Sequence, residues 1–391
     1  MGGLGLEMSE LRSALEEIGA DGWLLYDFHG VNPVTARVLG LSGMATRRLF
    51  VLLPREGEPV AVAHKIELQP LEGFPGRIVP YARWQELEAA LGQLVKGRTL
   101  AMEVFPEDGV PYLDRVPAGV IELLTRLGAT VVPSSSLVTR FAALWQPQEV
   151  EDHLYAAETI ADIARTILAE VVADPESGVG EVEVQRRVVE AMESRGLVLD
   201  TMPIVAFGAN AANPHYEPRE GSDATLKPNE VVLLDLWGGR SLQTVFADQT
   251  WMGYAGPSPS ARVLELWQTV RAARDAAAAR IREGVAEGRP VAGYEGDRAA
   301  REVIENKGFG EYFVHRTGHS IDRELHGSGP HLDDYETHDA RLLMPGVGFS
   351  IEPGIYIPGE IGVRSEVNMY WGPDGLVVTP EAPQESLITT A

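Results

Sequence analysis

The sequence predicts an α/β protein with two domains, a smaller one built on a mixed sheet and a larger one that repeats its own pattern. Three observations predict this fold class. The chain has 391 residues, more than a single domain of roughly 150 residues accounts for. Helical and strand-like patterns alternate over about the first 145 residues. After Pro147, two helices followed by a strand hairpin occur in the same order twice.

In the first domain, apolar residues at Leu11, Leu15 and Ile18 follow helical spacing and predict a helix that ends at Gly19. Short apolar runs predict strands at 23–26, 49–53, 60–63 and 100–104, the second and third joined as a hairpin by the turn at 54–57. Helical patterns lie around 84–95 and 117–127. Nothing in this domain indicates catalysis.

The second domain begins with a long amphipathic helix after Pro147, and we place the boundary so that the domains are 1–146 and 147–391. Helices at 148–173 and 181–195 precede strands at 231–236 and 243–252. Helices at 259–284 and 293–306 precede strands at 348–357 and 361–370. The repeat predicts a pseudo-symmetric α/β sandwich in which the two hairpins face each other.

Composition restricts the classes of function. The formal net charge is −24 and the pI about 4.8, which repels phosphate backbones and anionic lipids, so we expect no nucleic-acid or membrane partner. The absence of Cys excludes disulfides, thiolate zinc sites and a cysteine nucleophile. No apolar run reaches the roughly 18 residues of a membrane span, and the start lacks a signal-peptide pattern. We therefore expect a soluble, cytoplasmic protein.

Acidic residues follow the apolar strands of both predicted hairpins. Asp235 ends the run at 231–234, and Asp248 comes thirteen residues later, where the returning strand brings it close. Two carboxylates in an apolar setting cost several kcal/mol unless a proton or cation neutralises them. The alternative is that each Asp ends a strand and faces water.

The second hairpin repeats this arrangement. Glu352 follows an apolar run directly before the turn signal Pro353-Gly354. Strand alternation places Arg364 and Glu366 on one face, and a Glu flanked by apolar residues fits poorly with a solvated surface.

Histidines concentrate between the acids, since five of the nine lie from His315 to His338, and His319 stands among them in the run HRTGHS. A lone His is more often a hydrogen-bonded residue than a ligand. One imidazole with four carboxylates, however, suits two divalent cations such as Mn²⁺, Co²⁺, Fe²⁺ or Zn²⁺. A hydroxide bridging two such ions is a nucleophile at neutral pH, which predicts metal-assisted hydrolysis.

The segments VVLLDLWGG, VFADQT, HRTGHSI, SIEPGIYI and GVRSEV resemble the pita-bread-fold metallopeptidases of the proline-specific branch, Xaa-Pro dipeptidase (prolidase) and aminopeptidase P. The resemblance covers about 148–391, and the first domain is similar in layout to the creatinase-like amino-terminal domain of that branch. It implies a creatinase-like α/β domain followed by a pita-bread catalytic domain. A homodimer is also implied.

The resemblance implies five metal ligands, namely Asp235, Asp248, His319, Glu352 and Glu366. Asp248 and Glu366 would bridge two divalent ions, with Mn²⁺ foremost among the candidates. Glu352 would also shuttle a proton from the bridging water to the leaving nitrogen.

Four further residues match positions that line the family's substrate pocket, namely His215, His315, His326 and Arg364. His315 and His326 would stabilise the oxyanion of the attacked bond and count as catalytic. The fork of Arg364 suits either a substrate carboxylate or a neighbouring Asp, and Thr250, on the same face as Asp248, would hydrogen-bond a ligand carboxylate.

The expected reaction is hydrolysis of the imide bond in Xaa-Pro dipeptides. The first alternative is an aminopeptidase P that releases the first residue of longer Xaa-Pro peptides. A creatinase-like hydrolase and a non-catalytic pita-bread binding protein are further alternatives. The chain departs from the family in a longer turn at 236–247 and in Trp251, where relatives often have Arg, and both departures bear on specificity.

Overall fold

The computed structural model describes residues 4–41 and 45–390. The chain divides into two compact units, Met1–Ala143 and Leu144–Ala391. The division falls three residues before the boundary placed from the sequence. None of the helices formed by these described residues is long and apolar enough to cross a membrane.

In the first unit, the described residues form a mixed sheet in the order β4-β3-β2-β1-β5-β6. Its strands are β1 (Gly22–Asp27), β2 (Leu49–Pro54), β3 (Val60–His64), β4 (Arg77–Tyr81), β5 (Thr99–Met102) and β6 (Thr130–Pro133). Strand β1 pairs antiparallel with β2 and parallel with β5. The antiparallel pairing of β2 with β3 confirms the predicted hairpin.

Helices cover both faces of this sheet. They are α1 (Met8–Glu17), α2 (Pro33–Leu39), α3 (Trp84–Val95), α4 (Ala118–Arg126) and α5 (Ser135–Phe141). Strand β1 is buried on both sides, because Trp23 and Leu25 pack with α1, α2 and α5 while Leu24 and Tyr26 pack with α3 and α4. Helix α2 was not predicted, although Asn32 caps it and Pro33 begins it, a recognisable start signal.

The second unit has the repeated order that the sequence predicts. Its first half comprises α6 (Pro147–Ala173), α7 (Glu181–Ser194), β7 (Ile204–Phe207), β8 (Val231–Gly238) and β9 (Ala247–Tyr254). Its second half comprises α8 (Ala261–Ala286), α9 (Gly293–Asn306), β10 (Ser320–Ile321), β11 (Gly348–Ile351), β12 (Gly354–Ile357), β13 (Ile361–Arg364), β14 (Val367–Gly372), β15 (Gly375–Thr379) and β16 (Ile388–Thr389). The two predicted strands of the second hairpin are each divided in two.

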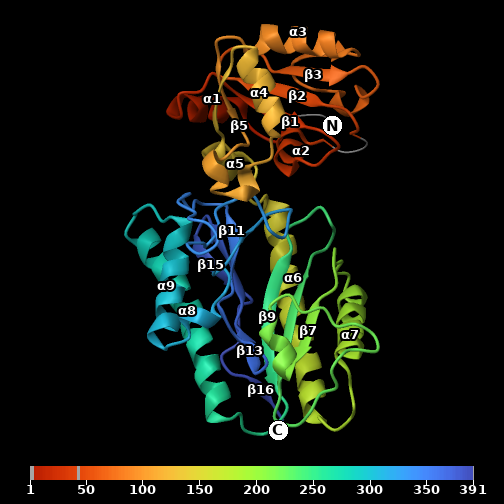
Figure 1. The fold of residues 1–391 in the computed structure, drawn as a ribbon, viewed down its shortest axis with the longest axis vertical. Coiled ribbons are helices and arrows are strands. Elements are labelled where there is room, and N and C mark those ends of the chain that lie inside the picture. The colour runs from red at the N-terminus through yellow and green to blue at the C-terminus, as the bar shows by residue number, and fades with distance from the viewer. Residues whose placement is uncertain (1–3, 42–44, 391) are drawn as a thin grey trace. The chain divides into compact units, whose positions relative to one another are not determined.

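The helices of this unit lie outside its strands (Figure 1). Val232, Leu234 and Leu236 of β8 pack in the core formed with α6 and α7. Leu233 of β8 and Met252 of β9 belong instead to the core shared with α8 and the second hairpin. Since side chains alternate along a strand, the odd-numbered residues of β8 and the even-numbered residues of β9 face the second half of the unit.

Candidate metal centre

Asp235 and Asp248 lie on the strand faces that turn toward the second half. In the β8–β9 ladder, Asp235 is opposite Thr250 and Trp237 is opposite Asp248, so the two carboxylates are diagonal neighbours on one face. Both are buried, at 7% and 5% exposure. Strand alternation therefore places both acidic side chains on the inner face, where they are buried.

Glu352 and Glu366 face each other at a break in the second hairpin. Ile351 pairs with Val367 on one side of the break, and Gly354 pairs with Arg364 on the other, in the same register. At the break the Glu352 N–H donates to the carbonyl of Thr317, at 2.7 Å, instead of to the opposite strand. Glu352 and Glu366 therefore lie outside the paired strands.

His319 reaches the acids from the segment before β10. Its N–H donates to Ser350 Oγ at 2.9 Å, and a Cβ on the preceding Gly318 would lie 2.0 Å from the Ser350 carbonyl oxygen, so this close approach requires glycine. Nδ1 is 3.1 Å from the Ser320 carbonyl. Nε2 lies 3.4 Å from Asp248 Oδ2 and 3.3 Å from Glu352 Oε1.

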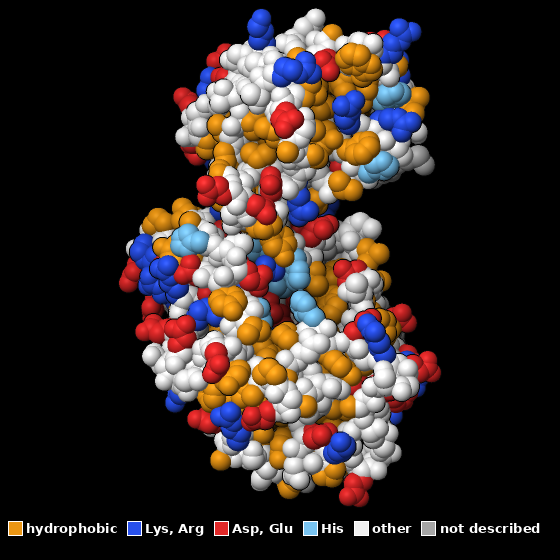
Figure 2. Space-filling model, viewed as in Figure 1, with side chains coloured by type: hydrophobic (Ala, Val, Ile, Leu, Met, Phe, Trp, Pro, Cys, Tyr) orange, Lys and Arg blue, Asp and Glu red, His pale blue; other side chains and the backbone are white. Residues whose placement is uncertain are grey.

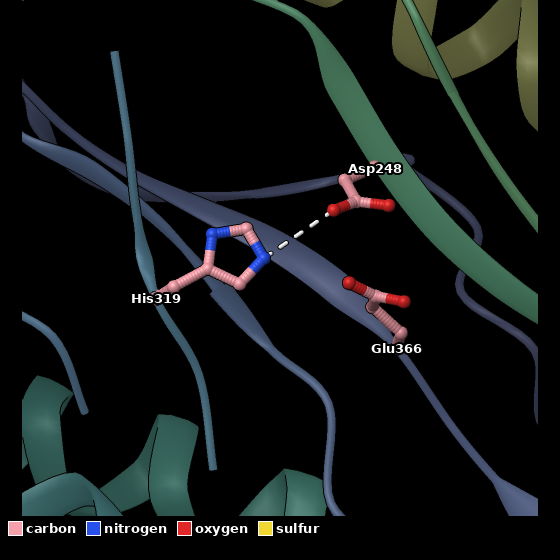
Figure 3. A group of neighbouring side chains, drawn as sticks. All are labelled: Asp248, His319 and Glu366. Carbon is pink, nitrogen blue, oxygen red and sulfur yellow. Dashed lines mark ion pairs between the residues drawn. The ribbon is translucent and has the colours of Figure 1, made fainter. Parts of the chain in front are cut away.

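The side chains of Asp248, His319 and Glu366 point toward one another from three separate segments (Figure 3). One ligand atom from each of them lies within 4.8 Å of the others. Glu366 Oε1 is buried and has no hydrogen-bond partner among the described residues. An orphaned carboxylate oxygen beside an imidazole nitrogen and a second carboxylate is the arrangement that a cation satisfies.

Thr250 and Arg364 connect Asp235 to this group. Thr250 Oγ1 is 2.7 Å from Glu366 Oε2 and 3.3 Å from Asp235 Oδ1. Arg364 Nε donates to Thr250 Oγ1 at 2.7 Å, and its Nη2 forms an ion pair with Asp235. Of the two partners expected for Arg364, the structure shows the neighbouring Asp, and the guanidinium is buried at 3% exposure.

Asn368 joins the two halves directly beside the acids. Its side-chain oxygen accepts from the Asp248 N–H at 2.9 Å, and its amide nitrogen donates to the Asp248 carbonyl at 2.8 Å. This two-way contact fixes the backbone of β9 against β14. Asn368 follows Glu366 by two residues, so strand alternation alone could have predicted that the two side chains share a face.

The acids perturb one another strongly. Burial raises the pKa of Asp235 to about 7, with Asp248 and Glu352 adding to the effect and Arg364 opposing it. Burial and the neighbouring acids also raise the pKa values of Asp248 and Glu366 well above their usual range. Burial acts to raise the pKa of Glu352, but electrostatic interaction with His319, His315 and the guanidinium of Arg364 outweighs it and holds this pKa at about 2. The group thus carries more carboxylates than its own cations neutralise.

The other predicted histidines lie around this group. The rings of His319 and His326 are 4.2 Å apart, and the charge of His319 together with burial lowers the pKa of His326 to about 3. His315 Nε2 is 2.9 Å from the Tyr356 hydroxyl, and burial lowers the pKa of His315 to about 4. Burial therefore favours the neutral ring of His315, and the hydroxyl of Tyr356, a residue that the sequence did not predict, fixes its orientation.

His215 is exposed and lies in the segment after β7. Buried Glu181 at the start of α7 holds this segment, since it accepts hydrogen bonds from Asn210 Nδ2 at 2.9 Å and from the Tyr216 hydroxyl at 2.7 Å. The charge of His215 acts on His326. Figure 2 shows histidine side chains lining a hollow of the second unit, with acidic atoms inside it.

Comparison with known proteins shows which sequences and structures this chain resembles. The sequence profile of metallopeptidase family M24 matches residues 156–371. The probable dipeptidase PepE of Mycobacterium tuberculosis is 29% identical over 358 residues, which cover 90% of this chain and 88% of the relative. The Xaa-Pro dipeptidase of Lactobacillus helveticus is 33% identical over 236 residues, which cover 59% of this chain and 58% of the relative.

The crystal structure of dipeptidase PepE from Mycobacterium ulcerans is similar to this chain with a TM-score of 0.76 at 24% identity, over 98% of this chain and 97% of that one. The likeness extends over both units. The expected fold, an α/β domain followed by a pita-bread domain, is confirmed.

Proposed function

Because the chain belongs to metallopeptidase family M24, we propose that it hydrolyses the imide bond of Xaa-Pro dipeptides with two divalent metal ions. The observation that carries the proposal is the convergence of Asp248, His319 and Glu366 within 4.8 Å. Asp235 and Glu352 adjoin this group through Thr250 and His319. The family assignment supports a metallopeptidase, and the name of the L. helveticus relative supports the Xaa-Pro substrate.

The donor set fits divalent cations. Four carboxylates with one imidazole, excess negative charge and an orphaned Glu366 oxygen suit oxygen-preferring ions, and among these we propose Mn²⁺. Asp235, Asp248, His319, Glu352 and Glu366 would hold them. When bound, divalent cations supply Lewis acidity and an activated water at neutral pH.

The proton steps fall to Glu352. A bond to proline is a tertiary amide without an N–H, so the leaving nitrogen must gain a proton from the site. Glu352 is held ionised in contact with His319, the form that accepts a proton from the attacking water and passes it to that nitrogen. Its carboxylate also lies next to the Ser350 hydroxyl, which donates to Oε1 at 3.0 Å.

The histidines would contact the substrate. Neutral His326, beside His319, is placed to donate to the oxygen that becomes negative during attack. The hydrogen bond between His315 Nε2 and the Tyr356 hydroxyl fixes the His315 ring beside the proposed metal ligands. We propose that exposed His215 contacts the proline end of the substrate.

Two measurements test the proposal together. Elemental analysis of the purified protein is expected to give about two divalent ions per chain, and a screen of Xaa-Pro dipeptides is expected to give turnover that a chelator abolishes and Mn²⁺ restores. Ala-Pro compared with a longer Ala-Pro-initiated peptide separates a dipeptidase from an aminopeptidase. Turnover that persists after complete metal removal contradicts the proposal.

A further inference from the structure

Trp237 occupies the same strand face as the proposed metal ligands. It follows Asp235 by two residues on β8 and is directly opposite Asp248 on β9, so its side chain adjoins the Asp248 carboxylate on the inner face. Only 9% of Trp237 is exposed. None of the roles proposed above uses this indole, although it is the largest side chain on this face of β8.

The indole is held by a segment that bulges away from the ladder. Ile204 pairs with Asp235, and Val198 pairs with Gly239 through hydrogen bonds of 2.8 and 3.1 Å. Six residue steps therefore span the same distance as four steps on β8, which leaves two extra residues in 199–203. This excess length is what allows a side chain of the segment to reach the ring of Trp237.

Asp200 and Thr201 in this bulge bind the ring nitrogen. Trp237 Nε1 is 3.0 Å from Asp200 Oδ1 and 3.1 Å from Thr201 Oγ1, and the Thr201 hydroxyl donates to the same Asp200 oxygen at 3.1 Å. Asp200 is exposed. Its other oxygen, Oδ2, has no hydrogen-bond partner within residues 4–41 and 45–390.

Charge distinguishes Asp200 from the acids of the metal centre. The charges of four carboxylates and two divalent ions cancel, whereas Asp200 is a further carboxyl group outside that set. It adjoins the centre through Trp237, whose Nε1 is 3.0 Å from Asp200 Oδ1 and which lies directly opposite Asp248 in the ladder. On the histidine side, Arg316 follows His315 in the chain and supplies a guanidinium, whose Nη1 also pairs with Glu336 at 3.6 Å.

A dipeptide has a positive amino end and a negative carboxyl end, and it binds where these charges are matched. The Asp200 side of the centre therefore suits the ammonium group, and the side of Arg316 and the histidines suits the carboxylate. We propose that Asp200 and Trp237 form the subsite for the first residue of the substrate, in which Asp200 Oδ2 binds the α-ammonium group and the Trp237 ring limits the size of the side chain. This inference rests on the proposed function.

The size limit is tested with Trp237→Ala and a series of Gly-Pro, Ala-Pro, Leu-Pro and Phe-Pro. One methylene group more or less in an apolar pocket changes discrimination by about 10- to 200-fold, and loss of the indole opens more space than one methylene group. The ratio of kcat/KM for Phe-Pro to that for Ala-Pro is expected to rise about tenfold or more. Trp84→Ala is the matched control, because Trp84 is 61% exposed in the other unit, and its ratio is expected to stay at the parent value. A rise below about threefold in Trp237→Ala overturns the size limit.

The ammonium contact is tested with Asp200→Asn, an exposed change that keeps the oxygen bonded to the indole and removes the charge. We expect kcat/KM for Ala-Pro to fall about tenfold through KM, because an ionic hydrogen bond is lost. Propionyl-proline is Ala-Pro without its amino group, and its dissociation constant by calorimetry is expected to stay within about twofold. An equal loss for both compounds, or a loss for neither, overturns the contact.

The two proposals fail in different ways. If the parent protein with Mn²⁺ hydrolyses none of the four dipeptides, the proposed function is wrong. If the parent hydrolyses Ala-Pro while both variants keep its selectivity and KM, the function stands and the subsite assignment is wrong.

Discussion

The hydroxyl of Thr250 is the contact that connects the acids most directly, and Thr250→Val removes it with little change in shape. Thr250 is 1% exposed. Its oxygen accepts from Arg364 Nε at 2.7 Å and lies 2.7 Å from Glu366 Oε2, to which it donates. Valine leaves Arg364 and Glu366 buried and without this contact.

The magnitude follows from these two hydrogen bonds. A hydrogen bond to a charged group contributes about 1.5–3 kcal/mol, and an unsatisfied buried partner incurs its full desolvation cost. Losing the bond to charged Arg364, and the bond to Glu366, which contributes about 0.5–1.5 kcal/mol because its raised pKa favours the neutral form, lowers the free energy of unfolding of the metal-free second unit by at least about 2 kcal/mol. Because Glu366 loses the group that orients it, affinity for Mn²⁺ is expected to fall roughly 10- to 100-fold.

The assay is urea unfolding of the chelator-treated protein followed by circular dichroism, with calorimetric titration of Mn²⁺ into the folded protein. Two compact units predict up to two transitions, and the one that Mn²⁺ shifts belongs to the second unit. Thr250→Ser is the control, because it keeps the hydroxyl and loses one methyl group, about 0.8 kcal/mol. If Val and Ser variants unfold within about 1 kcal/mol of each other, the hydroxyl does not hold the acids together.

Three further predictions concern the same centre. Glu352→Gln is expected to retain metal by elemental analysis while turnover falls at least about 100-fold, whereas Asp248→Asn is expected to lose metal; equal turnover in Glu352→Gln and the parent would remove Glu352 from the proton path. Asp235 and Glu366 have raised pKa values, so their contribution to the stability of the metal-free protein is complete below about pH 4 and is lost as pH rises, through about 7 in the case of Asp235. Buried histidines with lowered pKa values, such as His315 and His326, change stability in the opposite direction up to about pH 6.5. From pH 5 to pH 8 the melting temperature of the metal-free parent should therefore fall relative to that of Asp235→Asn, while Mn²⁺ affinity rises, and the opposite trends would contradict the pKa directions. Asn368→Ala removes two hydrogen bonds to the Asp248 backbone and is expected to lower unfolding free energy by about 1–3 kcal/mol, which urea titration measures against Asn368→Asp.

The long helices and the hairpins could be predicted because they depend on local periodicity. The expected helix at 293–306 coincides with α9 (Gly293–Asn306), and that at 148–173 differs from α6 by one residue. The strand expected at 243–252 begins instead at Ala247, because residues 243–246 belong to the longer turn. Strands β10 and β16 have two residues each, too short for any periodicity to appear, and they exist only because a partner strand is adjacent.

The residues of the candidate site also fall into those that a local pattern predicts and those that it does not. Acids that end apolar strands are conspicuous in a sequence because burial of a charge is costly, and alternation also points to Trp237 and Asn368. Asp200 gives no such signal. Its approach to the site depends on the two extra residues between Val198 and Ile204 relative to the opposite strand, a comparison of lengths that requires the register of both strands.

The two hairpins present their acids differently, and strand pairing accounts for the difference. In the first hairpin the acids are diagonal, so the ladder from Val231 to Gly238 continues without a break. In the second, the register places Glu352 directly opposite Glu366, and two like charges facing each other destabilise a ladder. The hairpin opens at that pair, and the Glu352 N–H turns to the carbonyl of Thr317, on the segment that leads to His319. The break that relieves the repulsion thus also connects the segment leading to His319 with the acids. The pseudo-symmetry of the two hairpins is therefore lost at the place where His319, the fifth proposed ligand, joins the four carboxylates.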